Sequence, residues 1–338
     1  MAVYIRSLAR PALAMRQPLR VSTCHLRRTH DSTHNLPLPP GSWDSHVHVI
    51  GPEHLYPFAQ GRAYTPREAP LAKLQTFLKN IHPNITHPVL VALSVHGTDN
   101  SCIIAALEEL SAQKPTAPPR AVVSIDPLTI PDDELNAMHA AGARGARMNL
   151  KSSLSEPSAE EFERTLRAYA DRLKPLKTWP LQIHLSLHQV PLIADTIPKL
   201  GITVIIDHLA APSTKKPLTP AHEQPGYREF MRLLSRGEIY TKLSGTDRFP
   251  NLPALDAYAT EVVATAPDRV VWASDWPHTG GVRMNPGGNR LHTQGFRAVD
   301  DAGMLRRAVE VYCKGDEGVV RRVWRDNARI LWDYDGED

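Results

Sequence analysis

The chain has 338 residues, of which 42% are hydrophobic and 22% charged, a composition typical of a folded globular protein rather than a disordered or fibrous one. No run approaches the ~18–20 consecutive apolar residues that a membrane-spanning helix needs, so no membrane span is predicted. The three cysteines are far apart in the sequence, which argues against a disulfide framework or a thiolate zinc site and fits a reducing compartment.

The first 40 residues differ from the rest in charge. They carry six arginines and one acid, Asp31, for a net charge of +5, which leaves −2 for residues 41–338. The folded part therefore lacks the basic signature of a nucleic-acid-binding protein. An Arg-rich segment with hydroxyl residues and almost no acids is typical of a mitochondrial transit peptide, and a disordered tail on a cytoplasmic protein is the alternative. We expect residues 1–40 to form a leader and residues 41–338 to form a single domain.

Beyond residue 42, short runs rich in Val and Ile alternate with longer segments of helical pattern, among them residues 101–113, 131–142, 159–173 and 252–266. Eight strands are predicted, at residues 43–50, 88–95, 120–126, 145–149, 181–186, 203–208, 239–244 and 270–276. Eight strands separated by helical crossovers predict an α/β fold that closes into a (β/α)8 TIM barrel. A doubly wound open sheet is the alternative, but the chain has neither a GxGxxG turn after the first strand nor a GxxxxGKS/T motif.

Histidines and two aspartates lie near the ends of several predicted strands. His46 and His48 are two positions apart on the first strand, so the alternation of a strand turns both imidazoles to the same side. The others are His184 on the fifth strand, Asp207 and His208 at the end of the sixth, and Asp275 at the end of the eighth. The C-terminal ends of barrel strands converge on one site. Imidazoles with one carboxylate are ligands that zinc prefers, so the set predicts a metal or catalytic centre, although a single buried histidine is more often a core residue.

Several sequence strings resemble the amidohydrolase superfamily, in its amidohydrolase-related (type 2) branch and near the 2-pyrone-4,6-dicarboxylate hydrolases and related lactonases of that branch. The strings are WDSHVHVIGP, FAQGRAYTP, SVHGTDN, GARGARMN, IIDHLA, KLSG, VVWASDWPH and RDNARILWDY, spread over about residues 41–334. The resemblance implies a barrel, a hydrolytic reaction on a small molecule and an aspartate that handles water.

The resemblance also implies roles for individual residues. Asp275 matches the general base, and His208 matches the sixth-strand histidine of the catalytic centre. The residues that match substrate contacts are Tyr64, Ser94, Arg147, Arg248 and His278. Two arginines of the dicarboxylate hydrolases are replaced here by Ser153 and Ala211, which argues against the same pair of substrate carboxylates, since a guanidinium binds a carboxylate through two parallel hydrogen bonds. Lys151 could replace one of them as a point charge.

At the fifth strand the dicarboxylate hydrolases have a tyrosine and work without metal, whereas this chain has a histidine. We therefore expect a divalent ion, with zinc favoured by the donor types. The expected ligands are His46, His48, His184 and Asp275, the last as ligand or base. The ion would polarise a substrate carbonyl while Asp275 takes a proton from water. Without an ion, His208 and a protonated pair of first-strand histidines would have to stabilise the oxyanion.

The favoured function is hydrolysis of a lactone or related cyclic ester of a small, carboxylated organic acid. One alternative is a metal-dependent decarboxylase of the same branch, and another is a barrel that binds a ligand without turnover. The Gly- and Pro-rich segments after the sixth and eighth strands, residues 209–227 and 278–290, predict a lid or a specificity loop. No sequence feature indicates an oligomeric state.

Overall fold

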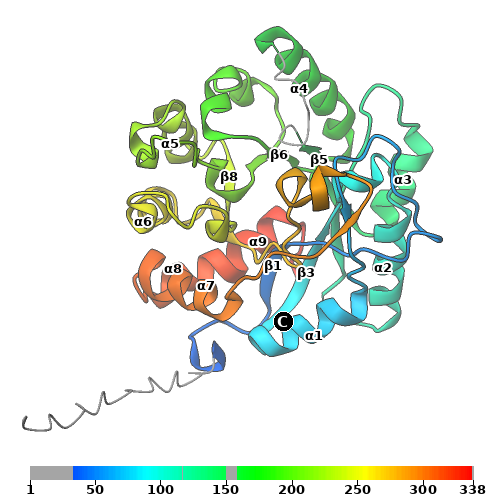
Figure 1. Cartoon of the computed structure of the whole chain (residues 1–338), viewed down its shortest axis with the longest axis horizontal. Helices are drawn as coiled ribbons and strands as arrows, with labels where there is room; N and C mark the ends of the chain where they lie inside the picture. Colours follow the sequence, from blue (N-terminus) through cyan, green and yellow to red (C-terminus); the bar gives the residue numbers. More distant parts are fainter. Residues whose placement is uncertain (1–32, 116, 150–157, 337–338) are drawn as a thin grey trace, which may run out of the picture. The chain divides into compact units, whose positions relative to one another are not determined.

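The computed structural model describes residues 33–115, 117–149 and 158–336, which form a (β/α)8 barrel (Figure 1). Eight parallel strands pair in the order β1-β3-β4-β5-β6-β7-β8-β9. Their bounds are β1 Ser42–Val47, β3 Ile85–Val91, β4 Arg120–Val123, β5 Ala143–Asn149, β6 Leu181–His184, β7 Val204–Ile206, β8 Tyr240–Leu243 and β9 Val270–Trp272. The backbone after β9 meets β1, where the His48 N–H donates to the Trp276 carbonyl at 2.8 Å. The predicted single-domain barrel is confirmed, and each predicted strand overlaps an observed one.

Helices surround the strands (Figure 1). Their bounds are α1 Leu71–Ile81, α2 Ser101–Ala112, α3 Asp132–Ala141, α4 Ala159–Leu173, α5 Tyr227–Ser235, α6 Leu255–Thr265, α7 Asp301–Arg307, α8 Glu317–Arg321 and α9 Asn327–Leu331. The predicted helices correspond to α2, α3, α4 and α6. The start of α4 could be predicted from the sequence because Ser158 and Glu161 form a capping box there. Its buried Phe162, Leu166 and Tyr169 recur at helical spacing along one face.

Residues 33–40 pack against the barrel, although their composition assigned them to the leader. Leu38 is buried, and its carbonyl accepts a hydrogen bond from Asn84 Nδ2 at 2.7 Å. The Thr33 hydroxyl donates to the Ile81 carbonyl at the end of α1. The compact unit accordingly begins at Thr33, before the expected boundary at residue 41. Residues 1–32 of the predicted leader lie outside the described residues.

The loops that follow β1 and β9 are joined to each other. Two short strands, β2 (Thr65–Pro66) and β10 (Thr293–Gln294), pair in parallel between them. Asn285 Nδ2 donates to the Ala63 carbonyl at 3.0 Å, and the Tyr64 hydroxyl donates to Thr279 Oγ1 at 3.2 Å. The segment 278–290, expected to be a lid or a specificity loop, is therefore anchored to the loop that follows the neighbouring strand β1 (orange in Figure 1).

The barrel interior is more polar than usual for this fold. Such interiors are filled mainly by Val, Ile and Leu, but His46, Gln182, Asp207 and Lys242 are each 0% exposed and contact one another. Burying polar groups is unfavourable unless they are hydrogen-bonded, so this layer indicates a function rather than a packing preference.

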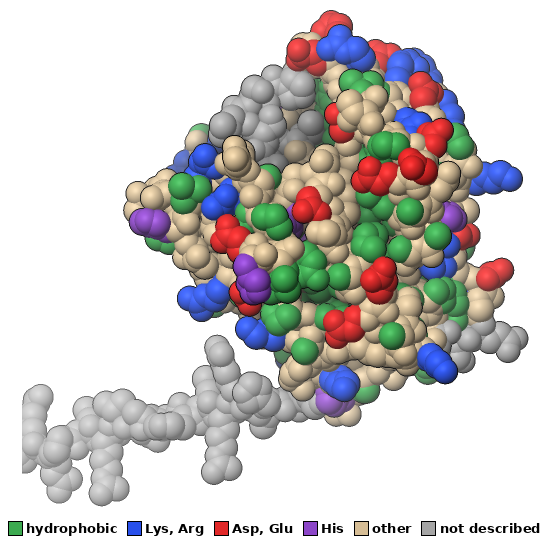
Figure 2. All heavy atoms as spheres, turned by 90° about the vertical axis from the view of Figure 1, so that its right-hand side faces the viewer, with side chains coloured by type: hydrophobic (Ala, Val, Ile, Leu, Met, Phe, Trp, Pro, Cys, Tyr) green, Lys and Arg blue, Asp and Glu red, His purple; other side chains and the backbone are tan. Residues whose placement is uncertain are grey.

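The outer surface shows a mixture of charges. On the face in Figure 2, acidic and basic side chains are interspersed and no broad basic patch is seen. No helix in the described part of the chain combines the length and the apolar character that crossing a membrane would require.

Candidate active site

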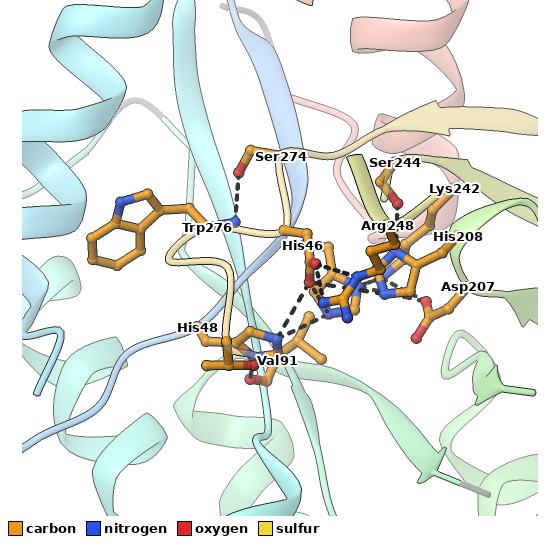
Figure 3. Close-up of polar contacts among 12 residues, drawn as sticks. His46, His48, Val91, Asp207, His208, Lys242, Ser244, Arg248, Ser274 and Trp276 are labelled. Atoms are coloured by element: carbon orange, nitrogen blue, oxygen red, sulfur yellow. Dashed lines mark hydrogen bonds and ion pairs between the residues drawn. The ribbon is translucent and has the colours of Figure 1, made fainter. Parts of the chain in front are cut away.

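Three imidazoles surround one carboxylate oxygen at the C-terminal ends of β1, β7 and β9 (Figure 3). The Nε2 atoms of His46, His48 and His208 lie 3.9, 3.8 and 3.8 Å from Asp275 Oδ1. His46 Nε2 and His48 Nε2 are 3.3 Å apart, and all four side chains are buried. The convergence expected from the strand ends is therefore observed for these four residues.

Two of these residues have backbone conformations that L-residues rarely adopt. Asp275 has a φ of 67°, and the four residues from His208 to Ala211 have φ values of 51°, 53°, 58° and 41°. Such strain costs on the order of 1–3 kcal/mol per residue and concentrates at functional sites. The end of β8 receives the His208 ring: Ser244 Oγ lies 2.8 Å from Nδ1, and a Cβ on Gly245 would lie 3.1 Å from Cγ of the ring. The KLSG string thus supplies both a hydrogen-bond partner and the space for this histidine.

The second oxygen of Asp275 is held by two guanidinium groups. Oδ2 accepts hydrogen bonds from Nε of Arg248 at 3.1 Å and from its Nη2, and from Nη2 of Arg297 at 3.4 Å. Burial would raise the pKa of the Asp275 carboxyl, but the Arg248 guanidinium and the neighbouring His208 hold that pKa well below its usual range. Asp275 is therefore ionised at neutral pH, with Oδ1 turned toward the imidazoles. Arg297, which precedes α7, belongs to none of the strings that pointed to this site.

The imidazoles are kept neutral by burial. Burial lowers the pKa of His46 and His48 below the usual value and lowers that of His208 to about 3. His48 Nδ1 lies 2.7 Å from the Val91 carbonyl and must donate to it, so His48 Nε2 carries a lone pair. A protonated pair of first-strand histidines, the expected alternative to metal, is disfavoured near neutral pH. Neutral imidazole is the form that binds a metal ion.

His46, His48 and Asp275 form a donor set that fits a divalent ion. In a tetrahedral site with bonds of about 2.0–2.1 Å, neighbouring donor atoms lie about 3.3 Å apart, which is the separation of the two Nε2 atoms. His46, Asp207 and His208 form a second group whose donor atoms lie within 4.8 Å of one another. Neither group of described residues includes His184, the expected third imidazole ligand. The centroid of the His184 ring lies 5.1 Å from that of the His208 ring. His208, rather than His184, lies next to His46 and His48.

A cavity of about 140 Å³ opens onto this centre. The predicted site residues that line it are His48, Tyr64, Ser94, Arg147, His184, His208, Arg248 and Asp275. Asn149, Thr279 and Val282 also line it and were not predicted. His46 lies deeper in the barrel and is fully buried.

Two other residues singled out from the sequence, His278 and Ala211, are not among the described residues of the cavity wall. His278 Nε2 is 2.8 Å from Asp301 Oδ1 on α7, and His278 is not among the described lining residues. Ala211 is 1% exposed at the end of the left-handed turn after β7. Lys151 and Ser153 lie outside the described residues.

A second charged group lies next to the imidazoles: the sequence pointed to Asp207 and Arg147, but Gln182 and Lys242 were missed. Asp207 Oδ2 accepts a hydrogen bond from Gln182 Nε2 at 2.9 Å and lies 3.6 Å from Arg147 Nη2. Lys242 Nζ lies 2.7 Å from Gln182 Oε1 and 3.6 Å from Asp207 Oδ1. Burial would raise the pKa of Asp207, but Lys242 and His46 hold it well below the usual range, while burial lowers the pKa of Lys242 to about 8. The sequence signal that could have found Lys242 was the presence of a lysine within the apolar run IYTKLS.

A buried imidazole and carboxylate centre, open to a small cavity at the C-terminal end of a (β/α)8 barrel, defines a barrel enzyme that acts on a small molecule. The chain belongs to the Amidohydrolase family, which matches residues 43–333. The predicted family and hydrolase class are thereby confirmed.

Individual relatives agree with this assignment. Over 250 residues the chain is 30% identical to the 4-sulfomuconolactone hydrolase of Hydrogenophaga intermedia, which covers 72% of this chain and 77% of the relative. Over 253 residues it is 30% identical to the 2-pyrone-4,6-dicarboxylate hydrolase of Comamonas testosteroni, which covers 71% and 78%. A solved structure from Pseudomonas putida superposes with a TM-score of 0.68 at 24% identity, covering 89% of this chain and 100% of that one, a likeness of fold. These relatives support a lactone-opening hydrolase.

Proposed function

We propose that this enzyme hydrolyses the cyclic ester of a small, carboxylated lactone, with Asp275 as the general base. The observation that carries the proposal is that the two oxygens of this carboxylate have different contacts. Oδ2 is held by Arg248 and Arg297, while Oδ1 faces three neutral imidazoles next to the cavity. The names of the two 30% identical relatives, a muconolactone hydrolase and a pyrone dicarboxylate hydrolase, support a cyclic ester as the substrate class.

The cavity favours a small anionic substrate. Its volume of about 140 Å³ limits it to a small molecule. Arg147 and Arg248 lie in its wall, and a guanidinium is the side chain best suited to bind a carboxylate. Alanine at position 211 and serine at position 153 support a pattern of substrate acid groups that differs from the one bound by the dicarboxylate hydrolases.

In the proposed reaction Asp275 Oδ1 accepts a proton from a water molecule as the water oxygen attacks the lactone carbonyl carbon. The tetrahedral oxyanion that forms is stabilised by donors in the cavity wall, of which Arg147 and Arg248 are the charged ones. The carbonyl reforms as the ring C–O bond breaks, and Asp275 returns its proton to the leaving oxygen. The product carries a new hydroxyl and a new carboxylic acid, which ionises at neutral pH and releases one proton per ring opened.

The donor set of His46, His48 and Asp275 would hold the divalent ion, and we propose zinc because these donors are two imidazoles and one carboxylate. When bound, such an ion supplies Lewis-acid polarisation of the carbonyl and lowers the pKa of a coordinated water to about 7.

A lactone panel tests the proposed reaction. Lactones with and without a carboxylate would be assayed for proton release with a pH indicator, and headspace carbon dioxide would be measured in the same samples. We expect turnover of carboxylated lactones, one proton per ring and no carbon dioxide. Stoichiometric carbon dioxide would instead support the decarboxylase alternative, and folded protein that opens no member of the panel would contradict the proposal.

We also propose that the Arg-rich segment before residue 33 directs the protein to mitochondria, on the strength of its charge pattern. Residues 1–32 fused to a fluorescent protein should localise with a mitochondrial dye, and a variant with the six arginines replaced by glutamine should not. Diffuse fluorescence of the unmodified fusion would argue for a cytoplasmic protein.

A further inference from the structure

His46 Nδ1 lies between one side chain that can only donate a hydrogen bond to it and another that can only accept a hydrogen bond from it (Figure 3). Lys242 Nζ is 3.2 Å away, and an ammonium group can only donate a hydrogen bond. Asp207 Oδ1 is 3.5 Å away, and a carboxylate can only accept one. Because a neutral imidazole has one N–H, the partner of Nδ1 decides which ring nitrogen carries the hydrogen.

The surroundings of Lys242 favour donation to His46. Its side chain is 0% exposed, and three acceptors lie around Nζ: Gln182 Oε1 at 2.7 Å, His46 Nδ1 at 3.2 Å and Asp207 Oδ1 at 3.6 Å. Two of the three N–H bonds of the ammonium group therefore have an acceptor at hydrogen-bonding distance, and Asp207 Oδ1 pairs with its charge at 3.6 Å. Gln182 is oriented by the same network, because its Nε2 donates to Asp207 Oδ2 while its oxygen faces the lysine.

Donation by Lys242 produces a hydrogen-bond chain that runs in one direction. With His46 Nδ1 as an acceptor, the imidazole hydrogen is on Nε2, which lies 3.3 Å from His48 Nε2. His48 Nε2 is an acceptor, because His48 Nδ1 donates to the Val91 carbonyl. The chain therefore runs from Lys242 through His46 and His48 to Val91, and every donor in it has an acceptor.

Binding of a divalent ion requires the other tautomer. The Nε2 atoms of His46 and His48 must both offer lone pairs to the ion, so the His46 hydrogen must move to Nδ1 and face Asp207. Lys242 then loses its acceptor on the ring while its positive charge stays next to the site. We propose that Lys242 is a positioning residue that fixes the Nε2–H tautomer of His46, and thereby weakens binding of a divalent ion by His46, His48 and Asp275. This inference concerns the resting centre and does not depend on a lactone being the substrate.

Zinc affinity of a lysine variant tests the inference. Lys242→Met keeps an unbranched side chain of similar length but removes the donor and the charge. The matched control is Lys79→Met, which removes the same charge from an exposed position on α1. Zn²⁺ alone would be titrated into the apo full-length proteins in competition with a chromophoric chelator. We expect Lys242→Met to bind zinc at least tenfold more tightly than the wild type, and Lys79→Met to match the wild type.

The tautomer itself provides an independent measurement. In protein labelled with ¹⁵N-histidine and free of metal, His46 would be assigned by comparison with a His46→Asn variant. The wild type should show a protonated Nε2 and an unprotonated Nδ1, and Lys242→Met should show the reverse. If zinc affinity rises while the His46 tautomer stays the same, the effect of Lys242 is one of charge alone and the inference is wrong.

A variant that removes both partners covers the case in which Lys242→Met fails to fold because Asp207 is left with a buried charge. Lys242→Met combined with Asp207→Asn removes the ion pair as a unit, which is often tolerated when loss of one partner is not. Without Lys242 the Gln182 amide can turn over, so that its oxygen accepts from the new amide nitrogen and the new carbonyl accepts from His46 Nδ1. The same tightening and the same tautomer change are then expected. Unchanged or weaker zinc binding in the folded variants, with His46 Nδ1 already protonated in the wild type, would overturn the inference.

Discussion

Replacement of Asp275 by asparagine tests the centre of the proposed reaction. The two side chains have nearly the same shape, but only the carboxylate can take a proton from water. Asp275 is 2% exposed on its side chain, and its Oδ1 lies 3.8–3.9 Å from three imidazole nitrogens. Little rearrangement is needed to place the amide, so a loss of activity would report the loss of the base rather than a change of the cavity.

The kinetic effect should be large and the effect on stability moderate. A general base contributes about 10²–10⁴-fold, so kcat/KM should fall by that factor, equivalent to roughly 2.7–5.5 kcal/mol of transition-state stabilisation. The amide also loses charge-assisted hydrogen bonds to Arg248 and Arg297, each worth about 1.5–3 kcal/mol when fully buried. These arginines are 24% and 19% exposed and can be partly rehydrated, so we expect a loss of about 2–3 kcal/mol in the free energy of unfolding.

Initial rates on the best lactone of the panel and urea unfolding curves measure the two effects separately. Asp256→Asn is a matched control, because Asp256 is an acid paired with Arg307 on the surface and is not among the described residues that line the cavity. The control should keep its rate. A folded Asp275→Asn enzyme that retains more than about a tenth of the wild-type rate would refute Asp275 as the base, since a general base is worth at least about 10².

Three further changes test the surroundings of the site. In Arg248→Met the pKa of Asp275 should rise because its nearest cation is gone, so the acid limb of the pH profile of kcat/KM should move to higher pH; an unmoved limb would contradict the electrostatic role of Arg248. Burial raises the pKa of Asp44 to about 7, so its contribution to stability is present below its unfolded pKa of 3.8 and is lost as pH rises through about 7, an effect of up to about 4 kcal/mol. Asp44→Asn should therefore gain stability relative to the wild type between pH 5 and pH 8 in urea unfolding, and an equal difference at both pH values would contradict this account. A chain starting at Thr33 should be as stable as the full chain. A chain starting at Gly41 should lose about 2–4 kcal/mol in the free energy of unfolding, because it lacks the buried Leu38 side chain and the hydrogen bond from Asn84. Equal stability of the two truncated chains would show that residues 33–40 contribute nothing to it.

The fold and part of the site were predictable because they depend on local pattern. Runs of Val and Ile marked the strands, and the alternation along β1 correctly placed His46 and His48 on one side. The rule that strand ends converge in a barrel brought Asp275 to the same place. These inferences needed only the register of each strand and the closure of the sheet.

The choice between His184 and His208 depended on backbone that the sequence did not reveal. His184 is the last residue of the strand β6 and His208 lies just after β7, but His208 begins four consecutive residues with positive φ, in the run HLAA, which contains no glycine. Nothing in that run predicts a left-handed turn, since L-residues adopt it only when the surrounding structure imposes it. The residues that contact the His208 ring, Ser244 and Gly245, come directly after the next strand, β8. Arg297 was missed for the same reason, because only tertiary contacts bring it to Asp275.

The balance of charge links the proposed substrate to the resting state of the centre. Among the described residues, the cations that contact Asp207 or Asp275 are Arg147, Lys242, Arg248 and Arg297, four positive charges against two carboxylates. Asp247 pairs with Arg297, and the remaining positive excess favours an anionic ligand and weakens, without preventing, the binding of a divalent ion. The same excess holds Asp275 ionised but makes it a weak base. A substrate carboxylate that accepts hydrogen bonds from Arg248 would make Asp275 a stronger base, because it would offset the positive charge beside that carboxylate. Arg248 is both part of the cavity wall and the nearest cation to Asp275. In the proposed reaction, substrate binding and the strength of the base would therefore be coupled through a single guanidinium.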